Sequence, residues 1–194
     1  YGIGQVGQTI AAHAARAGHQ VHCVDIDETV VSQIRSGEIF DSAIQDQITA
    51  STDGEATAMT IDAAIIAVPT PLTTTYAVDL GSVRAAIADL AAGLANADRD
   101  DVLVVIESTV PPGTTAEVVD PILAEESGLD ADRYGLAFCP ERTASGTALR
   151  DIRGQYPKIV GGVDAESTRV ARLVYEELSD NGVVSVSDAR TAEA

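Results

Sequence analysis

The chain has 194 residues, of which 45% are hydrophobic, and a formal net charge of −18 from 30 acidic and 12 basic side chains. This length allows one large domain with a buried core, and the excess of acid disfavours nucleic-acid binding, which needs a basic patch. No apolar run approaches the ~18 residues that cross a membrane, so we expect no membrane partner.

The chain opens on Tyr1-Gly-Ile-Gly-Gln-Val-Gly7, in which three glycines have the spacing G-x-G-x-x-G. A helix is expected to follow and to end near Gly18, before an apolar strand over residues 21–24 and then Asp25. In this pattern the first glycine makes a tight turn, the second lets a pyrophosphate approach the backbone, and the third lets the helix pack closely. Asp25 is placed to accept hydrogen bonds from ribose hydroxyls, which predicts a dinucleotide site and favours NAD over NADP.

Two points of this opening stay open. The same glycines occur in purely structural turns between a strand and a helix, so the motif alone is weak evidence. No apolar strand precedes Gly2, although the pattern normally follows one, and we therefore expect the sequence to begin inside a truncated first strand.

Apolar strands and amphipathic helices alternate along the rest of the chain. We expect helices over residues 27–37 (capped by Asp27), 79–96, 114–126 (capped by Thr114 or Thr115) and 164–178. Strands are expected over residues 63–68, 102–106, 134–139, 158–163 and 183–186. Residues 38–60 are polar and weakly patterned, and one short helix around residues 44–48 is expected there. The alternation predicts an α/β fold of the Rossmann type, with a doubly wound, mostly parallel sheet whose first strand is truncated.

Polar residues follow three of these strands, at the sheet edge where parallel sheets bind ligands. Thr70 follows the strand 63–68, the run Glu107-Ser-Thr109 follows the strand 102–106, and the pair Glu141-Arg142 follows the strand 134–139. A carboxylate beside a dry cleft can act as a general base, and an arginine can bind phosphate in a bidentate way. The alternatives are ordinary strand-to-helix loops and a surface ion pair.

Five motifs occur in one order: Gly2 to Gly7, Val68-Pro-Thr-Pro71, Glu107-Ser-Thr-Val-Pro-Pro-Gly-Thr-Thr115, Cys139-Pro-Glu-Arg142 and Ile159-Val-Gly-Gly162. Together they resemble the amino-terminal NAD-binding domain of the UDP-glucose/GDP-mannose dehydrogenase family, most of all its UDP-N-acetyl-D-mannosamine dehydrogenase branch. The resemblance implies an NAD-dependent nucleotide-sugar 6-dehydrogenase of polysaccharide biosynthesis. Such an enzyme oxidises the C6 alcohol of a UDP-sugar to a carboxylate with two NAD+.

The resemblance also implies roles for individual residues. The catalytic pair would be Thr109 and Glu141, which position and activate water, and no metal is implied. Substrate contacts would come from Glu141, Arg142 and Thr143. Cofactor contacts would come from Gly2, Ile3, Gly4, Gln5, Val6, Gly7, Asp25, Val68, Thr70, Pro71, Ser108 and Thr109.

Some parts of the family pattern are missing. The family's nucleophilic cysteine and catalytic lysine lie in later segments, so we expect this chain alone to be inactive. Cys139 precedes the Pro-Glu motif and is expected to be a small buried hydrophobe. Val30 stands where many relatives carry a basic residue for the cofactor. Residues 1–187 would form the NAD-binding domain, and residues 188–194 would begin a linker to a dimerisation and substrate domain, so that the protein is a homodimer.

Two other functions remain open from the sequence. One is another NAD-dependent dehydrogenase of the hydroxyacid type, and the other is a non-catalytic nucleotide-sensing module. Composition adds an expectation about habitat. Lysine occurs once and acidic residues spread along the whole chain, which is typical of proteins from salt-loving organisms. Both cysteines lie in apolar runs, which favours a reducing, cytoplasmic location.

Overall fold

The computed structural model describes residues 1–97, 101–141 and 156–194. Within these residues the strands form two sheets, one of order β1-β2 and one of order β3-β4-β5-β6-β7. Their bounds are β1 (Val21–Val24), β2 (Ile48–Ser51), β3 (Ala63–Ile66), β4 (Val102–Ile106), β5 (Tyr134–Phe138), β6 (Lys158–Gly162) and β7 (Val183–Ser185). All neighbouring strands run parallel except β5 and β6. The expected α/β fold with a mostly parallel sheet is therefore confirmed.

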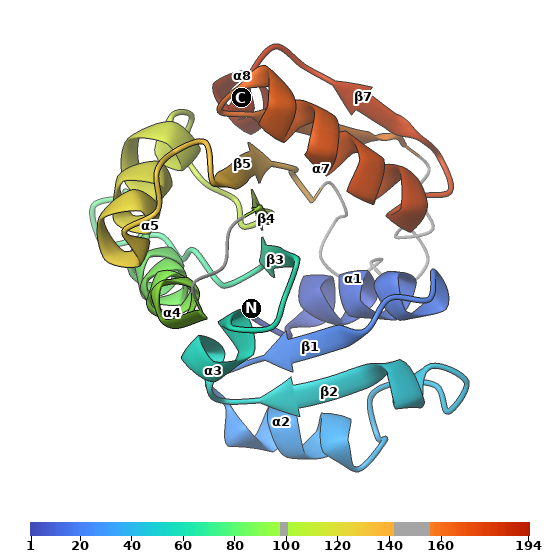
Figure 1. Cartoon of the computed structure of the whole chain (residues 1–194). Coiled ribbons are helices and arrows are strands. Elements are labelled where there is room, and N and C mark those ends of the chain that lie inside the picture. Colours follow the sequence, from blue (N-terminus) through green and yellow to red (C-terminus); the bar gives the residue numbers. More distant parts are fainter. Residues whose placement is uncertain (98–100, 142–155) are drawn as a thin grey trace.

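Helices cover both faces of the larger sheet (Figure 1). On one side of β3, β4 and β5 lie α4 (Gly81–Ala97) and α5 (Asp120–Ser127), and on the other side lie α1 (Gln5–Arg16) and α7 (Ala165–Leu178). The remaining helices are α2 (Glu28–Arg35), the 3-10 turn η1 (Gln45–Gln47), α3 (Gly54–Ala58), the π-helical turn η2 (Thr115–Val119) and α8 (Ala189–Glu193). Among the described residues no helix is long and apolar enough to cross a membrane.

Strand β4 lies at the centre of this layered core and is buried along its whole length. Its side chains alternate between the two layers of helices, as they must on a pleated strand. Val102, Val104 and Ile106 join the core that includes α4 and α5. Leu103 and Val105 join the core that includes Ala171 and Tyr175 of α7. The continuous apolar run in the sequence thus corresponds to a parallel strand covered on both faces.

Tyr1 and Gly2 lie between β1 and β3 and connect the two sheets. The Tyr1 amino group donates to the carbonyl oxygen of Ile65 at 2.9 Å, and Ala67 donates to Tyr1 at 2.8 Å. On the other side, Gly2 donates to the carbonyl oxygen of Val24 at 2.8 Å. A cavity of about 790 Å³ lies next to Tyr1 and Gly2, between the amino ends of β1 and β3. The expectation that a strand precedes Gly2 stays a prediction.

Residues 38–60 contain more structure than the sequence indicated. The turn η1 lies where a short helix was expected, but β2 and α3 were missed. Strand β2 pairs in parallel with β1 from Val21–Ile48 to Val24–Ser51, and only Ile48 of its four residues is buried. A short edge strand with one buried side chain gives no clear alternation of apolar and polar residues, which explains the wrong prediction.

The expected threonine cap of the helix near residue 114 is also wrong. Thr114 already has helical backbone angles and its hydroxyl donates to the carbonyl oxygen of Pro111, so it cannot act as an extended N-cap. The carboxylate of Glu193 on α8 replaces it. It accepts hydrogen bonds from the backbone N–H groups of Gly113 and Thr115, the latter at 2.8 Å, and from the Thr115 hydroxyl at 2.6 Å. This long-range cap fixes α8 to the loop that follows β4.

Glu193→Ala should lower the free energy of unfolding by about 1–3 kcal/mol, because it leaves partly buried donors without their charged acceptor. Glu117→Ala is the control, since Glu117 lies near the same helix start but its ion pair with Arg190 is exposed. Its effect should stay within about 1 kcal/mol. Urea unfolding of both variants measures the difference, and equal losses would contradict a capping role for Glu193.

Candidate functional site

The three glycines of the opening turn meet different steric requirements. Gly2 has a φ of +85°, and a Cβ there would lie 2.6 Å from the carbonyl oxygen of Ala67. A Cβ on Gly7 would overlap the carbonyl oxygen of Gly2. Gly4 is exposed, and a Cβ there would meet no atom within 4 Å. Gly2 and Gly7 are therefore required by the fold itself, whereas Gly4 leaves open space in front of the backbone.

The amino end of α1 faces this open space. Gly4 is its N-cap and supplies no side-chain acceptor, and the first turn contains no acidic residue. The N–H groups of this turn are therefore available to an anion, and the helix dipole favours negative charge there. A pyrophosphate needs both features together with close approach to the backbone. The residues present thus fit the phosphate part of a dinucleotide.

Asp25 lies directly after β1 and beside the glycine turn. One of its carboxylate oxygens accepts from the N–H of Ile3 at 2.7 Å, and the other accepts from the N–H of Asp27 at 2.9 Å. These bonds hold the carboxylate at the end of the strand. Each carboxylate oxygen can accept a further hydrogen bond, so Asp25 can still bind a hydroxyl group.

The loops that follow β3 and β4 are joined by side-chain hydrogen bonds. Thr70 donates to the carbonyl oxygen of Thr109 at 2.7 Å, and Ser108 donates to that of Val68 at 2.8 Å. Ser108 is buried and its hydroxyl points into this junction, whereas Thr109 and Pro71 are exposed. Because β3 and β4 are parallel neighbours, these residues share the edge where Asp25 also lies. The sequence predicted this grouping.

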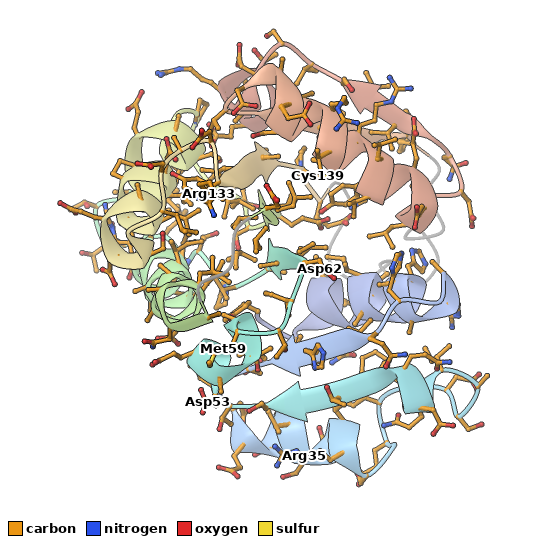
Figure 2. The ribbon with its side chains drawn as sticks, in the orientation of Figure 1. Arg35, Asp53, Met59, Asp62, Arg133 and Cys139 are labelled. Atoms are coloured by element: carbon orange, nitrogen blue, oxygen red, sulfur yellow. The ribbon has the colours of Figure 1, made fainter. Side chains whose placement is uncertain are left out.

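A cluster of charged and polar side chains lies below that edge, between the sheet and α7. Lys158 Nζ is 2.9 Å from a carboxylate oxygen of Glu141 and 3.5 Å from one of Glu107. The Tyr175 hydroxyl of α7 donates to the same oxygen of Glu107. Cys139, which follows β5 in Figure 2, is fully buried beside this group, as expected for a small hydrophobe.

Burial and charge change the protonation of this cluster. Burial raises the pKa of Glu107 above the ordinary value of a glutamate, although Lys158 and Tyr175 oppose the shift. Burial alone would lower the pKa of Lys158, but Glu107, Cys139 and Glu141 raise it, so the ammonium stays charged. Burial, followed by the charge of Glu107, raises the pKa of the Cys139 thiol, which opposes a role as a nucleophile.

The sequence predicted one part of this cluster and missed another. Glu141 was assigned to the edge, and Glu107 was placed there without a role. Lys158 and Tyr175 were missed, although Lys158 is the only lysine and begins an apolar strand, which could have marked it. Two predicted substrate contacts, Arg142 and Thr143, lie outside the described residues.

The NAD binding domain model of the UDP-glucose/GDP-mannose dehydrogenase family matches residues 1–179. The UDP-glucose 6-dehydrogenase AglM of Haloferax volcanii is 38% identical over 176 residues, which are 85% of this chain and 40% of that protein. The UDP-N-acetyl-D-mannosamine dehydrogenase of Methanococcus aeolicus is 32% identical over 202 residues, which are 99% of this chain and 44% of the relative. A solved UDP-glucose dehydrogenase from the archaeon Pyrobaculum islandicum has a TM-score of 0.86 at 29% identity, with 99% of this chain and 46% of that chain covered. The chain thus spans less than half the length of these relatives.

Substitutions at the exposed Gly4 and the buried Gly7 separate an effect on cofactor binding from an effect on folding. Gly4→Ala should change the free energy of unfolding by no more than about 0.5 kcal/mol, because its φ of −72° suits alanine and its Cβ meets no atom. It should weaken NAD binding by about tenfold or more, since the methyl group occupies the space of the pyrophosphate. Gly7→Ala should instead destabilise the fold by about 1–3 kcal/mol. Calorimetric NAD titration and thermal unfolding measure both effects, and unchanged NAD affinity in Gly4→Ala would contradict this site.

Proposed function

The chain belongs to the UDP-glucose/GDP-mannose dehydrogenase family, and we propose that it is the cofactor-binding part of an NAD-dependent nucleotide-sugar 6-dehydrogenase. The proposed reaction oxidises the C6 alcohol of a UDP-sugar, of the UDP-N-acetylmannosamine or UDP-glucose type, to a carboxylate. Each turnover would use two NAD+. A relative named UDP-glucose 6-dehydrogenase and one named UDP-N-acetyl-D-mannosamine dehydrogenase support these two substrate types.

One observation carries this proposal: the residues that we assign to dinucleotide binding and those that we assign to proton transfer follow strands that end at one edge of the sheet. The glycine turn and Asp25 lie at the end of β1, and Gly2 hydrogen bonds with that end. Thr109 and Glu141 follow β4 and β5, which are parallel neighbours. A dehydrogenase needs both groups at the same place, because a hydride and a proton leave the same alcohol. A nucleotide-sensing module would need only the first group.

In the proposed mechanism, bound NAD would supply the acceptor for the hydride from C6. The glycine turn and the first turn of α1 bind its pyrophosphate, and Asp25 binds its adenosine ribose. Glu141 takes up the proton of the C6 hydroxyl through a water that Thr109 helps to hold. Arg142 and Thr143 bind the sugar nucleotide. The side chains of this chain therefore bind, orient and accept protons, while further substrate contacts come from outside residues 1–187.

The remaining proposals concern the whole protein. We propose that residues 188–194 begin the link to a substrate and dimerisation domain, and that the protein is a cytoplasmic homodimer of polysaccharide biosynthesis. The share of the relatives that this chain spans, 40% and 44% in the two cases above, supports a further domain. The net charge of −18 supports a high-salt habitat, because salt screens the repulsion among surface carboxylates.

The full-length gene product should bind NAD about tenfold or more tightly than NADP, because Asp25 would repel a 2′-phosphate. Asp25→Asn should narrow this preference, since it removes the charge at the same position. Calorimetric titration of both cofactors in molar KCl provides the measurement. Equal or tighter NADP binding by the unchanged protein would refute the assignment of Asp25 to the ribose.

Glu141→Gln should lower kcat for NAD reduction with a UDP-sugar by about 10²–10⁴, the usual effect of losing a general base. NAD affinity should change little, because Glu141 is assigned to the proton and not to the cofactor. Glu126→Gln, an exposed change of the same chemistry on α5, serves as the control and should keep normal turnover. Near-normal turnover in Glu141→Gln would show that the base has been placed on the wrong residue.

A further inference from the structure

The position of Lys158 follows from the antiparallel strand pair β5–β6, the one such pair in the larger sheet among the described residues. Strands β5 and β6 pair Ala137 with Gly162 and Phe138 with Gly161. If this register continues beyond the end of β5, Glu141 lies opposite Lys158. The 2.9 Å distance between the Lys158 ammonium and the Glu141 carboxylate agrees with that placement. The reversed strand thus brings a lysine to the edge where the parallel strands β3, β4 and β5 end.

The surroundings of Lys158 hold its ammonium group on several sides. Glu107 lies 3.5 Å away, and the ring centroid of Tyr175 lies 5.6 Å from Nζ. Glu107 is itself fixed, because it is buried and accepts a hydrogen bond from the Tyr175 hydroxyl. The Lys158 side chain is 24% exposed and that of Glu141 is 15% exposed. The lysine therefore connects the buried carboxylate of Glu107 to the partly exposed carboxylate of Glu141.

Stability alone does not account for this arrangement. Removing charges from water costs about as much as their attraction returns, so a buried ion pair is weak evidence for stabilisation. Here two carboxylates face one ammonium, and the second oxygen of Glu107 has no hydrogen-bond partner among the described residues. Apolar side chains of similar volume at this place would give similar or greater stability. The free-energy cost of burying these charges is expected where a charge has a function at the nearby edge.

We propose that Lys158 is the positioning residue of Glu141: its ammonium holds the Glu141 carboxylate in place and in its ionised form, while Glu107 and Tyr175 hold Lys158. This inference rests on the proposed function, in which Glu141 accepts the proton of the alcohol. Lys158 does not touch the substrate or the cofactor in this scheme. It acts only through Glu141.

The proposal makes a specific prediction for the pH dependence of turnover. Within the described part of the chain, the titratable groups that interact with Lys158 are Glu107 at the end of β4, Cys139 and Glu141 after β5, Tyr175 on α7 and His13 on α1. Without the ammonium, the negative charge of Glu141 loses the opposite charge that lies 2.9 Å from it. Glu141 should then keep its proton to higher pH, so the acid limb of turnover should move upward. A purely structural lysine would leave this limb in place.

The test uses the full-length gene product and follows NAD reduction with UDP-glucose and with UDP-N-acetylmannosamine across pH. Lys158→Met should lower kcat about tenfold or more and move the acid limb upward by about one pH unit, while KM for NAD stays unchanged. Lys158→Arg keeps the charge and should restore the limb and part of kcat. Arg172→Met removes one positive charge from an exposed ion pair on α7 and should change neither quantity.

A lower melting temperature of Lys158→Met with an unchanged acid limb and kcat would overturn the proposal. Should this variant fail to fold, the pair Lys158→Met with Glu107→Gln removes both charges of the buried contact and gives the same comparison. Carboxyl ¹³C NMR of the Glu141 side chain, assigned with Glu141→Gln, needs no turnover. An unchanged titration midpoint of Glu141 in the lysine variant would overturn the proposal, whether or not either sugar is oxidised. Failure of the unchanged protein to oxidise either sugar would refute the proposed function separately.

Discussion

The burial of β4 on both faces is the constraint on which the rest of the structure depends. Its five residues are all buried, and α4 and α5 cover one face while α7 covers the other. Parallel pairing with β3 and β5 then makes three strands end at one level. Polar residues that follow these strands therefore meet at that edge, while Glu107 is buried beside Tyr175 of α7. The candidate site is thus a consequence of how the core is packed.

Local features of this chain and the shared edge of its parallel strands were predictable from the sequence, whereas individual side-chain contacts between distant segments were not. The strand 102–106, the Asp27 cap and the glycine turn depend on neighbours within a few residues, and all three were expected correctly. The five ordered motifs also identified the family, which the match over residues 1–179 confirms. The Glu193 cap joins residues 78 apart, and no local pattern distinguishes it from an exposed glutamate.

The two kinds of positive side chain have different environments. Arg169 and Arg172 of α7 pair with glutamates on its surface, where water screens the charges and the pairs contribute little to stability. The single lysine instead lies in the buried cluster. An ammonium is a compact charge with three donors on a flexible stem, whereas a guanidinium is a planar fork. The compact group suits a place between two carboxylates that come from different strands. The sequence places this residue at the start of a predicted strand but does not identify its partners, because they follow other strands.

The proposed site uses different chemical groups for binding the cofactor and for accepting the proton. The cofactor end uses the backbone: Gly4 leaves space, the first turn of α1 offers N–H groups, and Asp25 is held by two backbone donors. Backbone N–H groups do not titrate, so the proposed phosphate contacts of the cofactor do not depend on pH. The proposed proton acceptor is Glu141, whose carboxylate lies 2.9 Å from the Lys158 ammonium. Because the backbone groups carry no titratable charge, a change in the buried cluster can alter proton transfer without altering cofactor binding.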